Sequence, residues 1–127
     1  MDKILWVGTG GFVGSVLRYL VSGYVQGMSG SIDIPYGTFA VNTIGCFVIG
    51  FLSELVEMRG VLTAEIRALL ITGTLGGFTT FSTFSNETMS LMRDGQTPLA
   101  LLNIGASVAA GLVAVWLGYS LAYAIWR

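Results

Sequence analysis

The chain has 127 residues, of which 54% are hydrophobic and only 10% are charged, and its formal net charge is −1. So few charges cannot coat a soluble globule, and without a basic cluster the chain offers no surface for nucleic acid, so the composition predicts a polytopic membrane protein. The absence of histidine and the single cysteine, Cys46, exclude Cys/His zinc sites, His-based triads and an intrachain disulfide, and we expect no enzymatic activity.

Four apolar stretches follow one another along the chain, at about residues 4–25, 38–56, 66–92 and 99–125. A helix rises about 1.5 Å per residue, so about 20 residues cross the hydrocarbon layer of a bilayer. The connections between the stretches are short and rich in turn residues, and none of them is long enough to fold separately. The pattern predicts one four-helix transmembrane domain over residues 1–127.

The first stretch contains a glycine-rich run at residues 8–14, GTGGFVG. This run is similar to the phosphate-binding turn of a dinucleotide-binding fold, and Asp33 follows at nearly the required distance. The three apolar spans that follow do not fit such a fold. Glycines spaced by four residues, such as Gly10 and Gly14, instead let helix backbones approach closely in a bilayer.

Arg18 is a charged residue well inside the first span, which makes it a functional candidate. It would either concentrate anions at a pore mouth, with Thr38 nearby as a donor, or pair with Glu87 or with acidic residues of a connection. Glu87 itself would repel an anion unless it is protonated or paired. The sequence leaves these alternatives open.

The third stretch carries the most informative segment, residues 73–84, GTLGGFTTFSTF. Hydroxyl and backbone polar groups persist at membrane depth only where protein or water satisfies them. We therefore expect the third helix to be broken within the membrane and to face something polar. Phe81 and Phe84 are three residues apart and would share one face of a regular helix.

The basic residues near the span ends give a weak orientation signal. Lys3, Arg59, Arg67 and Arg127 fall on the side that carries both termini, and only Arg93 falls on the other side. This count favours termini inside the cell. Arg67 and Arg127 lie at helix ends, where snorkelling also explains them.

The run from Gly76 to Phe84 resembles the signature of the small bacterial fluoride channels, the CrcB or Fluc family. The resemblance extends over essentially the whole chain, and its other matching residues are Gly10, Gly11, Gly14, Arg18, Tyr19, Gly37, Thr38, Val41, Asn42, Gly45, Glu87, Ser107 and Gly111. It implies a multi-pass protein of the bacterial inner membrane that forms an antiparallel, dual-topology homodimer. It also implies two pores lined by both subunits and a structural sodium ion between the subunits.

The residues suit the passage of a small, strongly hydrated anion, which needs closely placed uncharged donors in place of its water. Amides, hydroxyls and the positive edges of aromatic rings supply them. Read with the resemblance, the residues predict a fluoride path that includes Asn42, Phe81, Phe84, Ser82, Thr83 and Ser107. The vestibule is expected to include Arg18 and Thr38. The sodium site is expected to consist of the backbone carbonyls of Gly76 and Thr79. Interhelical hydrogen bonding is the alternative for the hydroxyls, and a water-filled kink is the alternative for the glycines.

Three functions remain compatible with the sequence. The first is a passive fluoride channel that lowers cytoplasmic fluoride and confers fluoride resistance. The second is a small dual-topology drug antiporter, which would need a buried carboxylate in the first span, where only Asp2 is near. The third is a structural subunit of a larger complex. Asn103 stands where some relatives carry tyrosine, so the lining contributed by the fourth span stays open.

Overall fold

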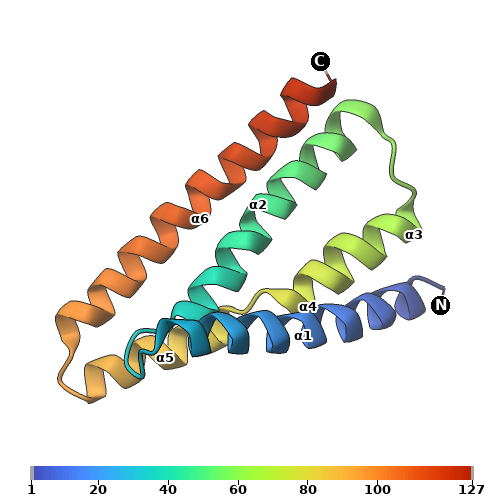
Figure 1. Ribbon diagram of the computed structural model, residues 1–127. Coiled ribbons are helices and arrows are strands. Elements are labelled where there is room, and N and C mark those ends of the chain that lie inside the picture. Colours follow the sequence, from blue (N-terminus) through green and yellow to red (C-terminus); the bar gives the residue numbers. More distant parts are fainter. Residues whose placement is uncertain (1, 127) are drawn as a thin grey trace.

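The computed structural model describes residues 2–126, and the secondary structure of this part of the chain consists of helices, without a strand (Figure 1). The helices are α1 (Asp2–Ser29), α2 (Tyr36–Arg59), α3 (Ala64–Arg67), the π-helical segment η1 (Ala68–Leu75), α4 (Gly76–Phe78), α5 (Phe81–Arg93) and α6 (Thr97–Trp126). The all-helical prediction is confirmed. Arg127, which contributes to the orientation count, lies outside the described residues.

Three of the described helices are long and apolar enough to cross a membrane: Asp2–Ser29, Tyr36–Glu57 and Thr97–Trp126. The remaining apolar stretch, expected at residues 66–92, is divided among α3, η1, α4 and α5. The prediction of a broken third helix is therefore confirmed.

The first connection is shorter than the sequence indicates, because α1 continues past Gln26 to Ser29. The Gln26 amide nitrogen donates to the carbonyl oxygens of Ser31 and Ile34 at 2.8 and 2.9 Å. Its amide oxygen accepts the N–H of Gly37 at 3.0 Å. Gln26 thus belongs to the last turns of α1 and fastens the connection from there.

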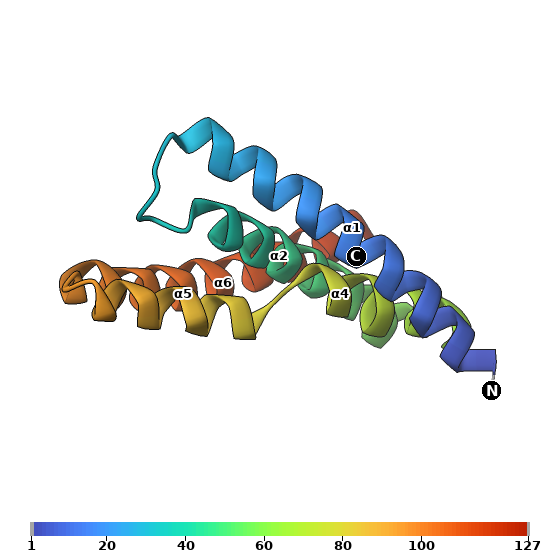
Figure 2. The same ribbon diagram turned by 90° about the horizontal axis from the view of Figure 1, so that it is seen from below.

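Glycines at close approaches determine how the helices pack. α1 lies against η1, and α2 lies along α6, as Figures 1 and 2 both show. A Cβ on Gly14 would overlap the carbonyl oxygen of Thr74, and a Cβ on Gly118 would overlap that of Phe47. The expectation that glycines bring the helix backbones together is confirmed at these positions.

The third apolar stretch breaks at Thr79 and Thr80, which are extended, with φ/ψ of −86°/157° and −152°/119°. The glycines before the break stay helical, since Gly76 has φ −60° and ψ −37°. The chain resumes as α5 at Phe81, and Figure 2 shows the extended link between α4 and α5. The break therefore lies at the two threonines, after Phe78 and not at the glycine pair.

Candidate functional site

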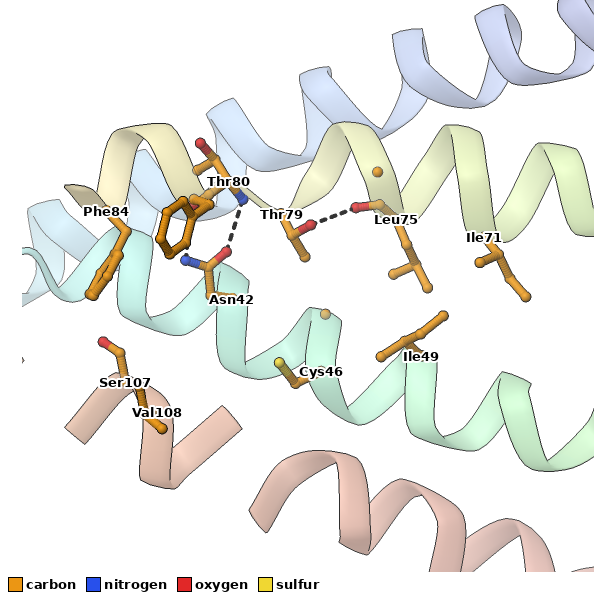
Figure 3. Close-up of a pocket in the computed structure, with 13 residues that line it drawn as sticks. Asn42, Cys46, Ile49, Ile71, Leu75, Thr79, Thr80, Phe84, Ser107 and Val108 are labelled. Carbon is orange, nitrogen blue, oxygen red and sulfur yellow. Dashed lines mark hydrogen bonds between the residues drawn. The ribbon is translucent and has the colours of Figure 1, made fainter. Parts of the chain in front are cut away.

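A cavity of about 440 Å³ lies beside the break. Figure 3 shows that its walls come from α2, from the two halves of the broken segment and from α6. Its lining residues are Asn42, Gly45, Cys46, Ile49, Ile71, Leu75, Gly76, Thr79, Thr80, Phe81, Phe84, Ser107 and Val108. The structure thus brings together six of the residues singled out from the sequence: Asn42, Gly76, Thr79, Phe81, Phe84 and Ser107. None of the lining side chains carries a charge.

Asn42 bridges the break with both ends of its amide group (Figure 3). Its Oδ1 accepts the N–H of Thr80 at 2.9 Å, and its Nδ2 donates to the carbonyl oxygen of Thr80 at 3.1 Å. This pairing fixes which end of the amide carries the nitrogen, because a backbone N–H only donates and a carbonyl only accepts. The second N–H of Nδ2 is not used in this pairing.

Two carbonyl groups lose their usual helical donors at the break. In a continuous α-helix the carbonyl of Gly76 would accept from the N–H of Thr80, and that of Thr79 from the N–H of Thr83. Here the Thr80 N–H donates to Asn42, and the Thr83 N–H donates to Oγ1 of Thr80 at 3.2 Å. Thr80 thereby caps the start of α5. The carbonyls of Gly76 and Thr79 are left without the N–H donors that a continuous helix would give them.

The rings of Phe81 and Phe84 lie at one end of the cavity, with centroids 5.7 Å apart and planes inclined by 43°. Phe84 is half-buried, whereas Phe81 is 79% exposed in the single chain. The hydroxyl of Ser107, on α6, faces the Phe84 ring (Figure 3). The two rings therefore share a face, as expected from their spacing.

A second cavity, of about 660 Å³, lies between α1, α2 and the start of α5. Its walls include Arg18, Thr38, Thr80 and Thr83. The two vestibule candidates, Arg18 and Thr38, thus border one space, and Thr80 borders both cavities. Ser82 borders neither of these two cavities, and its hydroxyl lies 3.3 Å from that of Thr80.

Glu87 is linked to α2 and not to Arg18. The hydroxyl of Thr38, a buried residue, donates to Oε1 of Glu87 at 2.5 Å. The other oxygen, Oε2, is buried and has no hydrogen-bond partner within the described chain. Within the described residues the hydrogen bond to Glu87 thus comes from Thr38 and none comes from Arg18, and the pairing of Arg18 with Glu87 stays a prediction.

The oxygen atoms beside the break that could hold a metal ion belong to uncharged groups. No group of three or more His, Cys, Asp or Glu side chains suited to a metal occurs among the described residues. Gly76 and Thr79 line the uncharged cavity beside the break, and the N–H groups that would bond their carbonyls in a continuous helix donate elsewhere. Backbone carbonyls at helix breaks are ligands for hard cations such as sodium.

The sequence analysis missed the central role of Thr80. A threonine directly before the first residue of a helix is a recognisable N-cap pattern. The pairing with Asn42 had no local signal, because the two residues lie 38 positions apart. The bond from Asn103 to Thr88 was missed for the same reason.

Comparison with known proteins places this geometry in context. The model of the family described as "CrcB-like protein, Camphor Resistance (CrcB)" matches residues 5–119. A protein of Chlorobaculum tepidum is 51% identical over 122 residues, which cover 96% of this chain and 95% of that protein. Proteins of Geobacter sulfurreducens and Rhizobium meliloti are 48% and 46% identical, covering 93% and 95% of this chain and 94% and 96% of their own lengths. All three relatives are named fluoride-specific ion channel FluC.

Proposed function

Because the chain belongs to the CrcB-like protein family, we propose that it is a fluoride-selective ion channel of the bacterial inner membrane. The observation that supports this most is the uncharged cavity beside the break, where an amide, a hydroxyl and two aromatic rings converge. Such a channel moves an ion and carries out no chemical reaction, so the protein is not an enzyme. Its relatives are bacterial proteins named as fluoride-specific channels.

The proposed route joins the two cavities at Thr80, the residue that borders both of them. Fluoride enters the space beside Arg18 and Thr38, where the positive charge of Arg18 raises the local anion concentration. It then passes Thr83 and the hydroxyl of Ser82 near Thr80 and reaches the cavity beside the break. Charge thus attracts the ion at the entrance but does not hold it inside.

Inside the uncharged cavity the ion exchanges its water for donors of the protein. The second N–H of Asn42 and the hydroxyl of Ser107 are such donors. The rings of Phe81 and Phe84 offer their positive edges, which attract an anion without a formal charge. A path without a full positive charge binds fluoride weakly enough to release it again.

The proposed assembly is an antiparallel, dual-topology homodimer with pores lined by both subunits. The exposed ring of Phe81 supports a second copy, because its surface is 79% uncovered and it borders the cavity that the ion would use. A sodium ion between the copies would be held by the carbonyls of Gly76 and Thr79 from each subunit. That ion is structural and is not transported.

The direction of flow follows from acid–base chemistry outside the protein. Neutral hydrogen fluoride crosses the bilayer and dissociates in the less acidic cytoplasm, where fluoride accumulates. The channel lets this fluoride flow out down its gradient, so no coupling to protons or to ATP is needed.

Fluoride efflux from liposomes tests the proposal. Protein reconstituted without a proton gradient should release trapped fluoride to an external fluoride electrode, and Phe81→Ile should slow the release roughly tenfold or more by removing a ring edge. Phe12→Ile is the matched control, because Phe12 is 73% exposed and borders neither cavity. Release that requires a proton gradient and accompanies a cationic drug would instead indicate an antiporter, and no release would refute the channel.

A further inference from the structure

Two side chains at the interface of α5 and α6 form a hydrogen-bonded relay outside the proposed route. Nδ2 of Asn103 donates to Oγ1 of Thr88 at 3.0 Å. Oγ1 of Thr88 in turn donates to the carbonyl oxygen of Phe84 at 2.8 Å. Thr88 is only 6% exposed, so water contributes little to this relay. The relay therefore connects α6, through Thr88, to the backbone of Phe84, a residue that borders the candidate cavity.

The direction of the relay is fixed by its last member. A carbonyl oxygen can only accept, so Thr88 must give its single proton to Phe84. The hydroxyl oxygen is then an acceptor toward α6, and Asn103 must present its NH₂ group to it. An aspartate at position 103 could not make this contact without taking the proton of Thr88 away from Phe84.

The relay lies in the middle of a helical hairpin. Three pairs of residues, one member on α5 and one on α6, lie at equal sequence distances before and after the midpoint of the connection between these helices. They are Phe84 and Ser107, Thr88 and Asn103, and Leu91 and Ala100. Near the connection, Leu91 is 4% and Ala100 0% exposed, which indicates tight packing there. At the open end, Phe84 and Ser107 border one cavity. The hydrogen bond at the central pair, Thr88 and Asn103, is thus placed to fix how far α5 is shifted along α6, and with it which residue of α6 lies opposite Phe84.

The flanking contacts do not set this register alone. Apolar packing of a leucine against an alanine tolerates sliding, whereas a donor and an acceptor at 3.0 Å tolerate little. The other polar link of α5, from Glu87 to Thr38, ties the helix to α2 and not to α6. Within the described residues, Asn103 to Thr88 is the one side-chain hydrogen bond between α5 and α6.

We propose that Asn103 and Thr88 are positioning residues that hold the ring of Phe84 opposite Ser107, and that Asn103 acts through Thr88 and not as a fluoride ligand. The geometric part of this proposal is independent of what the protein transports. Its effect on ion flow rests on the proposed fluoride channel.

The geometric part is tested by replacing Phe84 with 4-fluorophenylalanine and recording its ¹⁹F resonance in the reconstituted protein. Thr88→Val removes the hydroxyl at nearly constant volume and should shift or broaden the resonance. Thr88→Ser keeps the hydroxyl and should restore the parent signal. Thr9→Val is the matched control, because Thr9 donates to a carbonyl four residues earlier, as Thr88 does, but lies exposed on α1.

A second variant covers the case in which Thr88→Val does not fold. Asn103→Leu has nearly the same shape and removes the donor while leaving the bond from Thr88 to Phe84, so it should shift the resonance in the same direction. An unchanged resonance in every folded variant of the pair would overturn the proposal. So would an equal change in Thr9→Val.

Fluoride efflux measures the consequence in unlabelled protein. Thr88→Val should slow efflux roughly tenfold, the scale expected for one buried hydrogen bond, and Thr88→Ser should restore most of it. Full efflux in Thr88→Val would overturn the claim that the relay serves the pathway. A parent protein that releases no fluoride would refute the channel itself, and the ¹⁹F comparison would still decide whether the relay positions Phe84.

Discussion

The amide of Asn42 serves two purposes at once. Its two hydrogen bonds to Thr80 stabilise a break that would otherwise leave an N–H and a carbonyl unpaired at membrane depth. Asn42 also lines the cavity, and its remaining N–H is the donor proposed for the anion. In the proposed channel Asn42 both holds the backbone and contacts the ion, so a residue that makes only one of these contacts cannot replace it.

Asn42→Asp is therefore expected to abolish fluoride efflux, with a reduction of at least about a hundredfold from the added negative charge alone. The carboxylate also cannot donate to the carbonyl of Thr80. The control is Asn86→Asp, which makes the same change at an exposed position of α5. Efflux from liposomes is the measurement, and equal losses in both variants would contradict the role assigned to Asn42.

At this scale the sequence pointed to several residues that line the cavity, but it also pointed to Ser82 and Thr83, which do not line it, and it did not show how the residues are bonded. Asn42, Phe81, Phe84 and Ser107 do border one space. Their residue types and the family resemblance were sufficient for that. The hydrogen bonds to Thr80 join residues 38 positions apart, and such pairings depend on the register of packed helices, which residue types do not specify.

Among the elements, the close contact between α1 and η1 depends on glycine, which has no side chain. Gly14 lies where a Cβ would overlap the carbonyl oxygen of Thr74, so α1 can approach the broken segment only with glycine there. Because lipid gives little hydrophobic drive for helix association, such close packing is a main source of stability in the bilayer.

Gly14→Ala should destabilise the protein by about 1–3 kcal/mol, the usual cost of overpacking. Gly8→Ala is the control, because a Cβ on Gly8 meets no described atom within 4 Å. Helix propensity alone would make this control neutral or slightly stabilising. Thermal unfolding in detergent compares the two, and a stable Gly14→Ala variant would show that α1 and η1 are not in close contact.

The sequence predicted that the third helix breaks, but not at which residue of the run from Gly73 to Phe84. Glycine permits a break without requiring one, and Gly76 remains helical. The break forms one turn later, where Asn42 from α2 pairs with both backbone groups of Thr80. A polar contact from 38 positions away thus holds the backbone where the element ends.

At the scale of the whole molecule, a single chain leaves the candidate pathway incomplete. The ring of Phe81 is largely uncovered, and the carbonyls of Gly76 and Thr79 have lost their helical donors. A second, antiparallel copy would cover the ring and bring a second pair of carbonyls to a shared sodium ion. The weak Lys/Arg asymmetry of the sequence is compatible with insertion in both orientations.

Removing sodium should therefore impair the channel. Protein purified and reconstituted in choline chloride in place of sodium chloride is expected to release fluoride at least about tenfold more slowly, because ligand binding stabilises the assembled state by mass action. Returning sodium should restore the rate. Full efflux after a sodium-free preparation would contradict a structural sodium ion.

The central claim is that uncharged donors and ring edges form the ion route between paired copies. The most direct test is a crystal structure of the protein prepared in sodium and fluoride. We expect a continuous cavity between two antiparallel copies, with the ring edges of Phe81 and Phe84 and the amide of Asn42 around fluoride density. Rings that face lipid tails, with no continuous cavity beside Asn42, would contradict the claim.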